Sequence, residues 1–437
     1  MFSSLAGTLV VLLSISSSVH AAAIPSNDND VHDHAARSAL PGLWYHDESH
    51  PAHALFRRQA TTASSFPQVG SPTWASAYPA GTPVSSAMPQ AWIDALNVAV
   101  QANKIPNIAP SVQNTPAANP VYNGVSATDP SVCSGSYGCR VPGDIYDAPA
   151  GVMGLGFDDG PLAPSDNLYA FLKQNEIKAT HFYIGINIIA NWNEFNTAFQ
   201  TNQDDIAVHT WTHPYMTTLS NEDVVAQLGW TLQLIYNSTG GRLCRFWRPP
   251  YGDTDMRVSA IAKEVFGLTA IIWNQDTGDW ALGTQGGPTT QSIQTNFQNW
   301  LSGPQTTGLI ILEHELSDAA VQCFMAAYPL IKQYNWDLKS VASIDGKGAY
   351  QNAPDDTSSP VPIPLTAAGN GGAGLIAAMS TSTSTTPPPP SPTSSASSKQ
   401  SAHPGSGVKT GGALGSKSSP IMLSVSTLAL VFSLCLI

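Results

Sequence analysis

The chain has 437 residues, of which 42% are hydrophobic and only 11% are charged, and its formal net charge is −12. This length allows one or two packed domains. The acidic balance excludes the basic surface that nucleic-acid-binding proteins need, and it disfavours a substrate gripped through negative charge. An uncharged polysaccharide fits this composition better.

The first 58 residues are expected to lie outside the fold. A short apolar run that ends in small residues, Val19-His20-Ala21-Ala22, predicts a secretory signal peptide over residues 1–21. Residues 22–58 are polar and place several histidines among acidic residues, which predicts a disordered leader or a propeptide. They end at Arg57-Arg58, and this pair is either a processing site, with cleavage after Arg58, or a surface pair in a flexible leader.

Residues 59–148 are rich in Ala, Pro, Ser and Asn. Thr73–Ala77 and Pro89–Val100 carry a helical pattern, with Trp74 and Trp92 as expected anchors. We expect this segment to wrap the core and not to form a domain of its own.

Residues 149–345 differ in kind, because short apolar runs alternate with helical patterns. The strand-like runs are Val152–Phe157, Thr180–Ile184, Ile206–Val208, Arg245–Trp247, Leu268–Trp273 and Leu309–Leu312. The helical runs are Asn167–Leu172, Asn221–Tyr236 with Ser220 as its cap, Asp255–Phe266, Thr290–Leu301 and Ser317–Tyr334. Such alternation predicts parallel βα units. The predicted fold class is therefore α/β, a distorted or incomplete (β/α) barrel with parallel strands.

The chain is expected to end in a linker and an anchor signal. A Ser/Thr/Pro-rich linker is predicted over residues 346–410, and residues 411–437 combine small residues, a short polar spacer and a terminal apolar tail. That order is the signal for a glycosylphosphatidylinositol (GPI) anchor, with Gly407, Gly411 and Gly412 as candidate attachment residues. A tail-anchored membrane helix is the weaker alternative.

Cysteine usage indicates an oxidising compartment. Of five cysteines, Cys435 would leave with the tail, so that Cys133, Cys139, Cys244 and Cys323 remain. We expect two disulfides among them, with three possible pairings.

One glycosylation sequon is present, Asn237-Ser238-Thr239. It precedes Gly240-Gly241 at the end of a predicted helix. Asn237 is therefore expected in an exposed turn, where a glycan could be attached.

Five strand-like runs each end in a cluster of reactive side chains. The clusters are Asp158-Asp159-Gly160, His209-Thr210-Trp211-Thr212-His213, Arg248-Pro249-Pro250-Tyr251, Asp276-Thr277-Gly278-Asp279-Trp280 and Glu313-His314-Glu315. In a βα barrel the carboxyl ends of the strands share one face, and active sites form there. These clusters are therefore expected to meet in a single site.

His209 and His213 are candidate metal ligands. Threonines and a following proline favour a strand-to-loop turn over a helix for this pair. Two imidazoles and one carboxylate would leave open positions for water, as hydrolytic Zn²⁺ sites require. Of the adjacent carboxylates Asp158 and Asp159, one would bind the metal while the other works as a base.

The five clusters, taken in order, resemble the motifs of the polysaccharide deacetylase superfamily, also called the NodB homology domain or carbohydrate esterase family 4. They are Phe-Asp-Asp-Gly, His-Thr-Trp-Thr-His, Arg-Pro-Pro-Tyr, Asp-Thr-Gly-Asp-Trp and Leu-Glu-His-Glu, and together they most resemble fungal GPI-anchored chitin deacetylases. Two neighbouring positions depart from the pattern. Gly156 stands where Thr or Ser is common, and His181 stands where Phe is common. His181 is expected to be a packed strand residue and not a fourth ligand.

The resemblance implies how the acid–base and metal chemistry is divided. Asp158 would be the general base, and His314 would be the general acid. Asp159, His209 and His213 would hold one divalent metal ion, Zn²⁺ or Co²⁺.

The resemblance also implies supporting roles. Arg248 would fix the base, and Asp279 would orient and tune the acid. The Tyr251 backbone N–H would help to stabilise the oxyanion. Trp280 and Leu312 would shape the acetyl pocket, and Asp276 is a less certain partner.

The expected activity is metal-dependent hydrolysis of N-acetyl groups from chitin, giving chitosan and acetate. An O-acetyl esterase acting on another polysaccharide such as xylan would use the same site. A wall-anchored carbohydrate-binding protein without catalysis is a further alternative, although a binder has no need of Asp158, His209, His213 and His314 together. The expected partners are chitin or its oligosaccharides and, through a lipid anchor, the membrane, but no nucleic acid. A monomer is expected, secreted to the cell wall and the outer face of the plasma membrane.

Overall fold

The computed structural model describes residues 45–46, 49–56, 66–116 and 118–353. The predicted signal peptide, the Arg57-Arg58 pair, most of the predicted linker and the GPI-anchor signal lie outside these residues. Among the described helices, none is long and apolar enough to cross a membrane.

One parallel sheet forms the centre of the described structure. Its strands are β1 (Val152–Asp158), β2 (Thr180–Tyr183), β3 (Asp205–Val208), β4 (Phe246–Trp247), β5 (Thr269–Ala270), β6 (Gln275–Asp276), β7 (Leu309–Leu312) and β8 (Asp337–Ser340). They run in the order β5-β4-β3-β2-β1-β7-β6, and β8 pairs with β1. All pairs between these strands are parallel.

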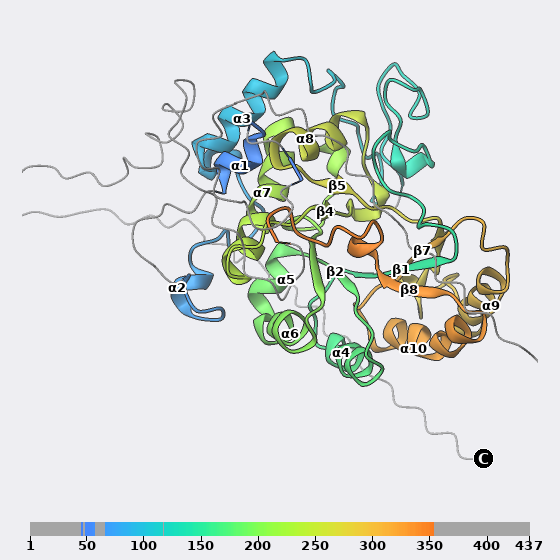
Figure 1. The fold of residues 1–437 in the computed structure, drawn as a ribbon. Coiled ribbons are helices and arrows are strands. Elements are labelled where there is room, and N and C mark those ends of the chain that lie inside the picture. The colour runs from blue at the N-terminus through green and yellow to red at the C-terminus, as the bar shows by residue number, and fades with distance from the viewer. Residues whose placement is uncertain (1–44, 47–48, 57–65, 117, 354–437) are drawn as a thin grey trace, which may run out of the picture. The chain divides into compact units, whose positions relative to one another are not determined.

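The two ends of this strand order are joined by a very short stretch of chain. Only residues 271–274 separate β5, which pairs with β4, from β6, which pairs with β7. Because each residue spans at most about 3.8 Å, the two edges must lie close together. The sheet is therefore curled, with strands at the centre and helices around them (Figure 1). The predicted distorted barrel of parallel strands is confirmed.

Helices follow most strands and cover the outside of the sheet. α4 (Ser165–Gln174) follows β1, α5 (Gly185–Ala190) and α6 (Trp192–Asn196) follow β2, α7 (Asn221–Ser238) follows β3, α8 (Met256–Phe266) follows β4, α9 (Thr290–Leu301) follows β6, and α10 (Asp318–Gln333) follows β7. Five of these were predicted from their apolar spacing. The predicted cap of α7 is confirmed, since Ser220 Oγ accepts a hydrogen bond from the Asp223 N–H at 3.1 Å.

The predicted strand Leu268–Trp273 is shorter in the structure and is followed by a second strand. β5 covers only Thr269–Ala270, and the chain then changes its pairing partner from β4 to β7. β6 and β8 were not predicted. Their residues are mostly polar and partly exposed, so they lack the apolar run that marked the other strands.

Two tryptophans hold the N-terminal segment to the helices. α2 (Pro72–Ala75) carries Trp74, whose Nε1 donates to Ser238 Oγ at 2.9 Å. α3 (Gln90–Gln101) packs on α7 and α8 through Trp92. A Cβ at Gly229 of α7 would lie 2.6 Å from the Trp92 ring, so the close approach of these two helices requires a glycine there.

The described part of the predicted leader is ordered. α1 (Pro51–Leu55) packs on α3 and α8, and both Leu55 and the following Phe56 are buried. The Phe56 ring lies 5.6 Å from the Tyr236 ring and 6.3 Å from the Phe266 ring, measured between centroids. The prediction of a disordered leader is therefore wrong for residues 49–56, because two apolar side chains find a place on the core.

The predicted start of the linker is also wrong. Tyr350, Gln351 and Asn352 are buried, and Gln351 Nε2 donates to the carbonyls of Cys244 and Phe266 at 2.7 and 2.9 Å. Residues 346–353 thus belong to the folded body. The residue types are polar, but their amides satisfy buried backbone groups.

One disulfide is present among the described residues, between Cys133 and Cys139. Cys244 and Cys323 are buried free thiols, so the second predicted disulfide is wrong. The Cys244 Sγ lies 3.3 Å from the Ile206 carbonyl oxygen beside the sheet, whereas Cys323 lies in α10. Each fills an apolar position on its own element, as small buried thiols commonly do.

Asn237 lies in the last turn of α7, so the predicted exposed turn is wrong at this residue. Its side chain is half-buried, and its Nδ2 donates to the Tyr78 hydroxyl at 2.8 Å. A glycan on Nδ2 would have to displace this hydrogen bond. The helix ends just after it, before Gly240 and Gly241, which both have positive φ.

Candidate functional site

Backbone hydrogen bonds hold the predicted clusters at one edge of the sheet. The Asp158 N–H donates to the Glu313 carbonyl at 3.0 Å, and the Arg248 N–H donates to the Val208 carbonyl, next to His209, at 2.9 Å. Pairing thus continues past the strand ends. The structure brings the five clusters together at the carboxyl ends of the strands.

Asp159, His209 and His213 form a group that could hold a metal ion, with one ligand atom from each residue within 4.8 Å of the others. Asp159 Oδ1 lies 3.3 Å from His209 Nε2 and 3.2 Å from His213 Nε2. This oxygen is buried, yet it makes no hydrogen bond of acceptable geometry. A buried carboxylate oxygen facing two ring nitrogens without hydrogen bonding to them is the arrangement that a shared cation would satisfy.

The protonation of these ligands suits a cation. His209 Nδ1 lies 2.7 Å from the Arg248 carbonyl, which can only accept, so Nδ1 carries the proton and Nε2 keeps its lone pair. Burial lowers the pKa of His213, which favours its neutral ring. Burial alone would raise the pKa of Asp159, but the two facing histidines hold that pKa well below its usual value.

Four non-glycine residues at the site have a left-handed backbone. Their φ angles are 72° at Asp159, 66° at Thr210, 60° at His213 and 59° at Tyr251. Such residues cost about 1–3 kcal/mol each and persist only where their surroundings hold them. Residue types alone did not indicate this conformation.

Gln227 of α7 holds the histidine loop and was missed by sequence reasoning. Its buried Oε1 accepts hydrogen bonds from the N–H groups of Trp211 and Thr212, both at 2.9 Å. Its Nε2 donates to Thr212 Oγ1 at 2.8 Å. A polar residue in the middle of an apolar helix, amid Val224, Val225, Ala226 and Leu228, was the signal that could have found it.

Asp158 is held by Arg248. Arg248 is fully buried, and its Nη1 lies 2.7 Å from Asp158 Oδ1, while its Nε donates to the Ile271 carbonyl at 2.9 Å. The guanidinium also lies over the Phe182 ring, 4.1 Å from its centroid. Asp158 Oδ2 faces the metal-ligand group, 3.9 Å from His209 Nε2. One carboxylate oxygen is thus fixed, and the other is directed at the site.

His314 is held by Asp279. Its Nδ1 lies 2.6 Å from Asp279 Oδ1, and its backbone N–H donates to Oδ2 at 2.9 Å. Burial lowers the pKa of His314, but the Asp279 carboxylate outweighs this effect, and the pKa rises to about 9. This pairing favours the protonated ring of His314. Asp276, the less certain partner, accepts a hydrogen bond from the Gly278 N–H at 2.8 Å and shapes this turn.

Exposed aromatic rings border the site. Tyr251 is 50% exposed and Trp280 is 58% exposed, while Leu312 is buried. The Tyr251 ring stacks on Tyr215, with centroids 4.0 Å apart, and lies edge-on to His213 at 4.6 Å. Large exposed aromatic rings beside a polar centre are typical of ligand-binding surfaces. Tyr215 was not predicted.

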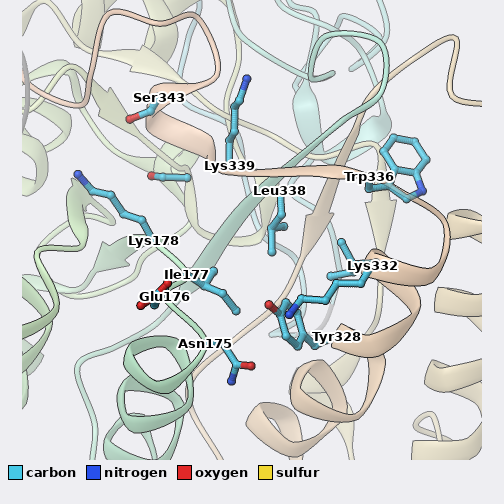
Figure 2. A pocket seen from close by; sticks show the side chains of 12 residues that line it. Asn175, Glu176, Ile177, Lys178, Tyr328, Lys332, Trp336, Leu338, Lys339 and Ser343 are labelled. Atoms are coloured by element: carbon cyan, nitrogen blue, oxygen red, sulfur yellow. The ribbon is translucent and has the colours of Figure 1, made fainter.

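A pocket of about 460 Å³ lies elsewhere, between the segment before β2, β8 and the end of α10 (Figure 2). Lys178 lies just before β2, and β8 pairs with the first residues of β1, so the pocket lies toward the amino-terminal ends of these two strands, away from the reactive clusters. Two of its lysines pair with acids, Lys178 with Asp205 at 3.2 Å and Lys339 with Asp337 at 2.8 Å. This pocket is not part of the candidate site.

Comparisons with known proteins point to one family. Residues 146–271 match the family described as Polysaccharide deacetylase. Chitin deacetylase 3 of Cryptococcus neoformans var. neoformans serotype D is 40% identical over 325 residues, covering 73% of this chain and 76% of the relative. The chain belongs to the polysaccharide deacetylase family.

Other similar proteins are more distant. The chitin deacetylase of Amylomyces rouxii is 34% identical over 247 residues, covering 49% of this polysaccharide deacetylase and 57% of the relative. Among solved structures, the chitin deacetylase of the fungal pathogen Colletotrichum lindemuthianum aligns with a TM-score of 0.42 and 24% identity, over 47% of this chain and 92% of that chain.

The family match covers only part of the site of this polysaccharide deacetylase. The matched residues 146–271 include the metal-ligand group, Asp158 and Arg248. Asp279 and His314 lie beyond the match, and the fold brings them to the same place.

Proposed function

We propose that this enzyme hydrolyses the N-acetyl groups of N-acetylglucosamine units in chitin, giving chitosan and acetate, with one divalent metal ion. The observation that carries the proposal is the group of two histidines and one aspartate that could hold a metal ion. Beside this group lie Asp158, which pairs with Arg248, and His314, which pairs with Asp279. Chitin as the substrate is supported by relatives 34–40% identical that are named chitin deacetylases.

Asp159, His209 and His213 would hold the metal, and this donor set suits Zn²⁺ or Co²⁺. When bound, the ion supplies a Lewis acid that polarises the acetyl carbonyl and makes an attacking water more acidic. The buried Asp159 Oδ1 without a hydrogen bond and the free lone pair on His209 Nε2 support this assignment.

The side chains of the enzyme move the protons. Asp158 takes a proton from the attacking water while the water oxygen bonds to the acetyl carbon. Arg248 keeps the Asp158 carboxylate in place. The Tyr251 N–H would donate to the developing oxyanion, a contribution of about 3–4 kcal/mol for one well-placed donor. His314 gives its proton to the sugar nitrogen as the C–N bond breaks, and acetate and a free amine result.

The binding surface fits a neutral sugar. Tyr251 and Trp280 expose flat faces at the site, with Leu312 buried nearby as a wall for the acetyl methyl group. Aromatic faces bind the apolar side of sugar rings without requiring charge. A net charge of −12 suits such a substrate better than an anionic one.

We also propose that the enzyme is secreted and GPI-anchored at the cell wall and plasma membrane. The signal-peptide pattern over residues 1–21 and the tail pattern over residues 411–437 support this placement. Release of the protein from cells by a phosphatidylinositol-specific phospholipase tests it, and retention after that treatment would contradict it.

The activity is tested by metal analysis of the purified protein together with acetate release from chitin oligomers and from acetyl-xylan. We expect about one metal ion per chain, acetate from the chitin oligomers, loss of activity on chelation and recovery with Zn²⁺ or Co²⁺. If acetate is still released from chitin after exhaustive chelation, the metal mechanism is contradicted. Release from acetyl-xylan alone would replace chitin by an O-acetylated substrate.

A further inference from the structure

A buried polar cluster lies directly behind the site, between the sheet and α4. It consists of His181, Glu315, Asp204, Tyr169 and Tyr183, and we call it the His181 cluster. All five side chains are at most 1% exposed. None of them has a role in the chemistry proposed above, yet buried charges are rare unless something requires them.

The hydrogen bonds of the cluster centre on the imidazole of His181. Its Nδ1 lies 2.8 Å from Glu315 Oε1, and its Nε2 lies 3.3 Å from Asp204 Oδ2. The Tyr169 hydroxyl donates to the other Glu315 oxygen at 2.7 Å and lies 2.6 Å from the Tyr183 hydroxyl. Because both ring nitrogens face carboxylate oxygens, both are placed to donate, and the ring serves as the cation between two anions.

The charge of His181 follows from this arrangement. Burial alone would lower its pKa, but the neighbouring Glu315 and Asp204 outweigh burial and raise the pKa to about 10. A buried carboxylate without a partner is very costly, so loss of the cation would leave Glu315 and Asp204 uncompensated. Both ring nitrogens are occupied, so His181 is not available as a metal ligand.

Glu315 links this cluster to the reactive residues in two ways. Its backbone N–H donates to the Asp158 carbonyl at 3.1 Å, and it directly follows His314 in the chain. Its side chain presses on Gly160, where an added Cβ would lie 2.4 Å from the Glu315 carboxyl carbon. Glu315 therefore contacts both the segment that carries Asp158 and Asp159 and the segment that carries His314.

We propose that His181 is a positioning residue for deacetylation, which holds the Glu315 carboxylate in one place and thereby fixes Asp158 and His314 relative to each other. This inference rests on the proposed function, because that function makes Asp158 and His314 the base and the acid. His181 touches neither the substrate nor the reacting atoms. It acts through Glu315.

The main test compares His181→Phe, Glu315→Gln and the double variant for acetate release from chitin oligomers, per folded and metal-loaded enzyme. Phe keeps the size of the ring and removes the cation. We expect each single variant to lower kcat by about tenfold or more, since small misplacements of reacting groups are costly. KM should stay within about twofold, because Tyr251 and Trp280 are untouched.

The double variant tests whether the two residues act as one unit. Because His181 is proposed to act only through Glu315, the double variant should lose about as much kcat as the worse single variant. Two losses that multiply, or a kcat for folded His181→Phe within twofold of the wild type, would overturn the proposal.

A second pair of variants covers the case in which His181→Phe does not fold. Tyr169→Phe removes the hydroxyl that holds Glu315, whereas the matched control Tyr183→Phe removes a hydroxyl that bonds Tyr169 and not Glu315. We expect Tyr169→Phe to lower kcat several-fold more than Tyr183→Phe. Equal effects of the two variants would contradict the proposal.

A third measurement does not depend on activity. In ¹⁵N-histidine-labelled full-length protein at pH 8, both ring nitrogens of His181 should show the shifts of a protonated ring, while exposed histidines are neutral. A neutral His181 ring at pH 8 would overturn the proposal. If the wild type released no acetate from any acetylated glycan, the proposed function would fail, but the ring state would still report on the cluster.

Discussion

Asp158 and His314 each depend on one buried partner of opposite charge. Arg248 lies 2.7 Å from Asp158, and Asp279 lies 2.6 Å from His314. In the proposed chemistry, Asp158 accepts a proton and His314 donates one, and the two pairs fix both groups in place. At the scale of single residues, the proposed chemistry requires a base without a proton and an acid with a proton at the same pH.

Asp158→Asn removes the proposed base and keeps its shape. We expect kcat for acetate release to fall by about 10²–10⁴-fold, the usual contribution of a positioned general base. Metal content should be unchanged, because Asp159, His209 and His213 remain. The matched control is Asp166→Asn, which alters an exposed aspartate in the first turn of α4. Unchanged turnover in Asp158→Asn would remove its assigned role.

Asp279→Asn should change the pH dependence of activity. The Asp279 carboxylate, with smaller contributions from Asp159 and Asp158, raises the pKa of His314 to about 9, so removing the charge of Asp279 lowers that pKa. The general acid then loses its proton at lower pH, and the alkaline limb of the kcat profile should move toward neutral pH. A bound cation lowers the His314 pKa in both proteins, so the comparison stands. An alkaline limb at the same pH in the wild type and in Asp279→Asn would contradict the role of Asp279 in tuning His314.

The same pair predicts how stability depends on pH. The pKa of His314 is raised in the folded state above its ordinary value of 6.5, to about 9. Its pairing with Asp279 therefore stabilises the fold fully below about pH 6.5, and this contribution is lost as the pH rises through about 9. Urea unfolding of the wild type and of Asp279→Asn should show a stability difference that shrinks across this window.

At the scale of secondary-structure elements, the site is positioned by the loops at the carboxyl ends of the strands. The loop after β3 takes two left-handed residues, Thr210 and His213, and α7 supports that loop through Gln227. Helix and loop are adjacent in sequence, so the strand–loop–helix unit builds much of the metal-ligand group by itself. Asp159, in the loop after β1, completes the group.

Gln227→Leu should loosen the histidine loop without touching a ligand. Leucine keeps the size of the side chain, but the N–H groups of Trp211 and Thr212 lose their acceptor. Loss of such outer support typically weakens metal binding by about 10–100-fold, and we expect the same here. Competition with a chelator measures the change. Gln233→Leu on the same helix is the control, and an equal effect of both variants would contradict the role of Gln227.

At the scale of the whole molecule, the barrel is enclosed by segments from both ends of the described chain. α1 and α3 pack on α8, and residues 349–353 run beside Cys244 and Phe266. α1 thus adds to the core, and we expect its contribution to be to stability. Residues 66–116 also reach the histidine loop, since Trp211 Nε1 donates to the Gly81 carbonyl at 2.9 Å.

Phe56→Ala tests this separation of stability from activity. Phe56 is 3% exposed and lies between Tyr236 and Phe266. Its truncation should lower the free energy of unfolding by about 3 kcal/mol, the low end for a buried phenylalanine. The kcat of the folded protein should not change. Val98→Ala, at a side chain 60% exposed on α3, should have little effect on either. A stability change below about 1 kcal/mol would mean that α1 is not docked in solution.

The amino-acid sequence by itself determined the parallel βα pattern and the residues that gather at the strand ends. Apolar runs fix the strands, since a buried parallel strand must be apolar on both faces. Polar residues directly after such runs must then lie at the carboxyl edge of the sheet. Asp158, His209 and His314 could be predicted for this reason.

Only the tertiary structure decided which polar residues support the site and which ends of the chain belong to the core. The His181 cluster acts through contacts between residues far apart in sequence, such as His181 and Glu315, and no local pattern encodes such contacts. The same reason explains why four further outcomes were not predicted: the free thiols of Cys244 and Cys323, the burial of Asn352 and the docking of Phe56. Their surroundings are supplied by other elements, so residue type alone did not reveal whether each would pair, lie exposed or pack.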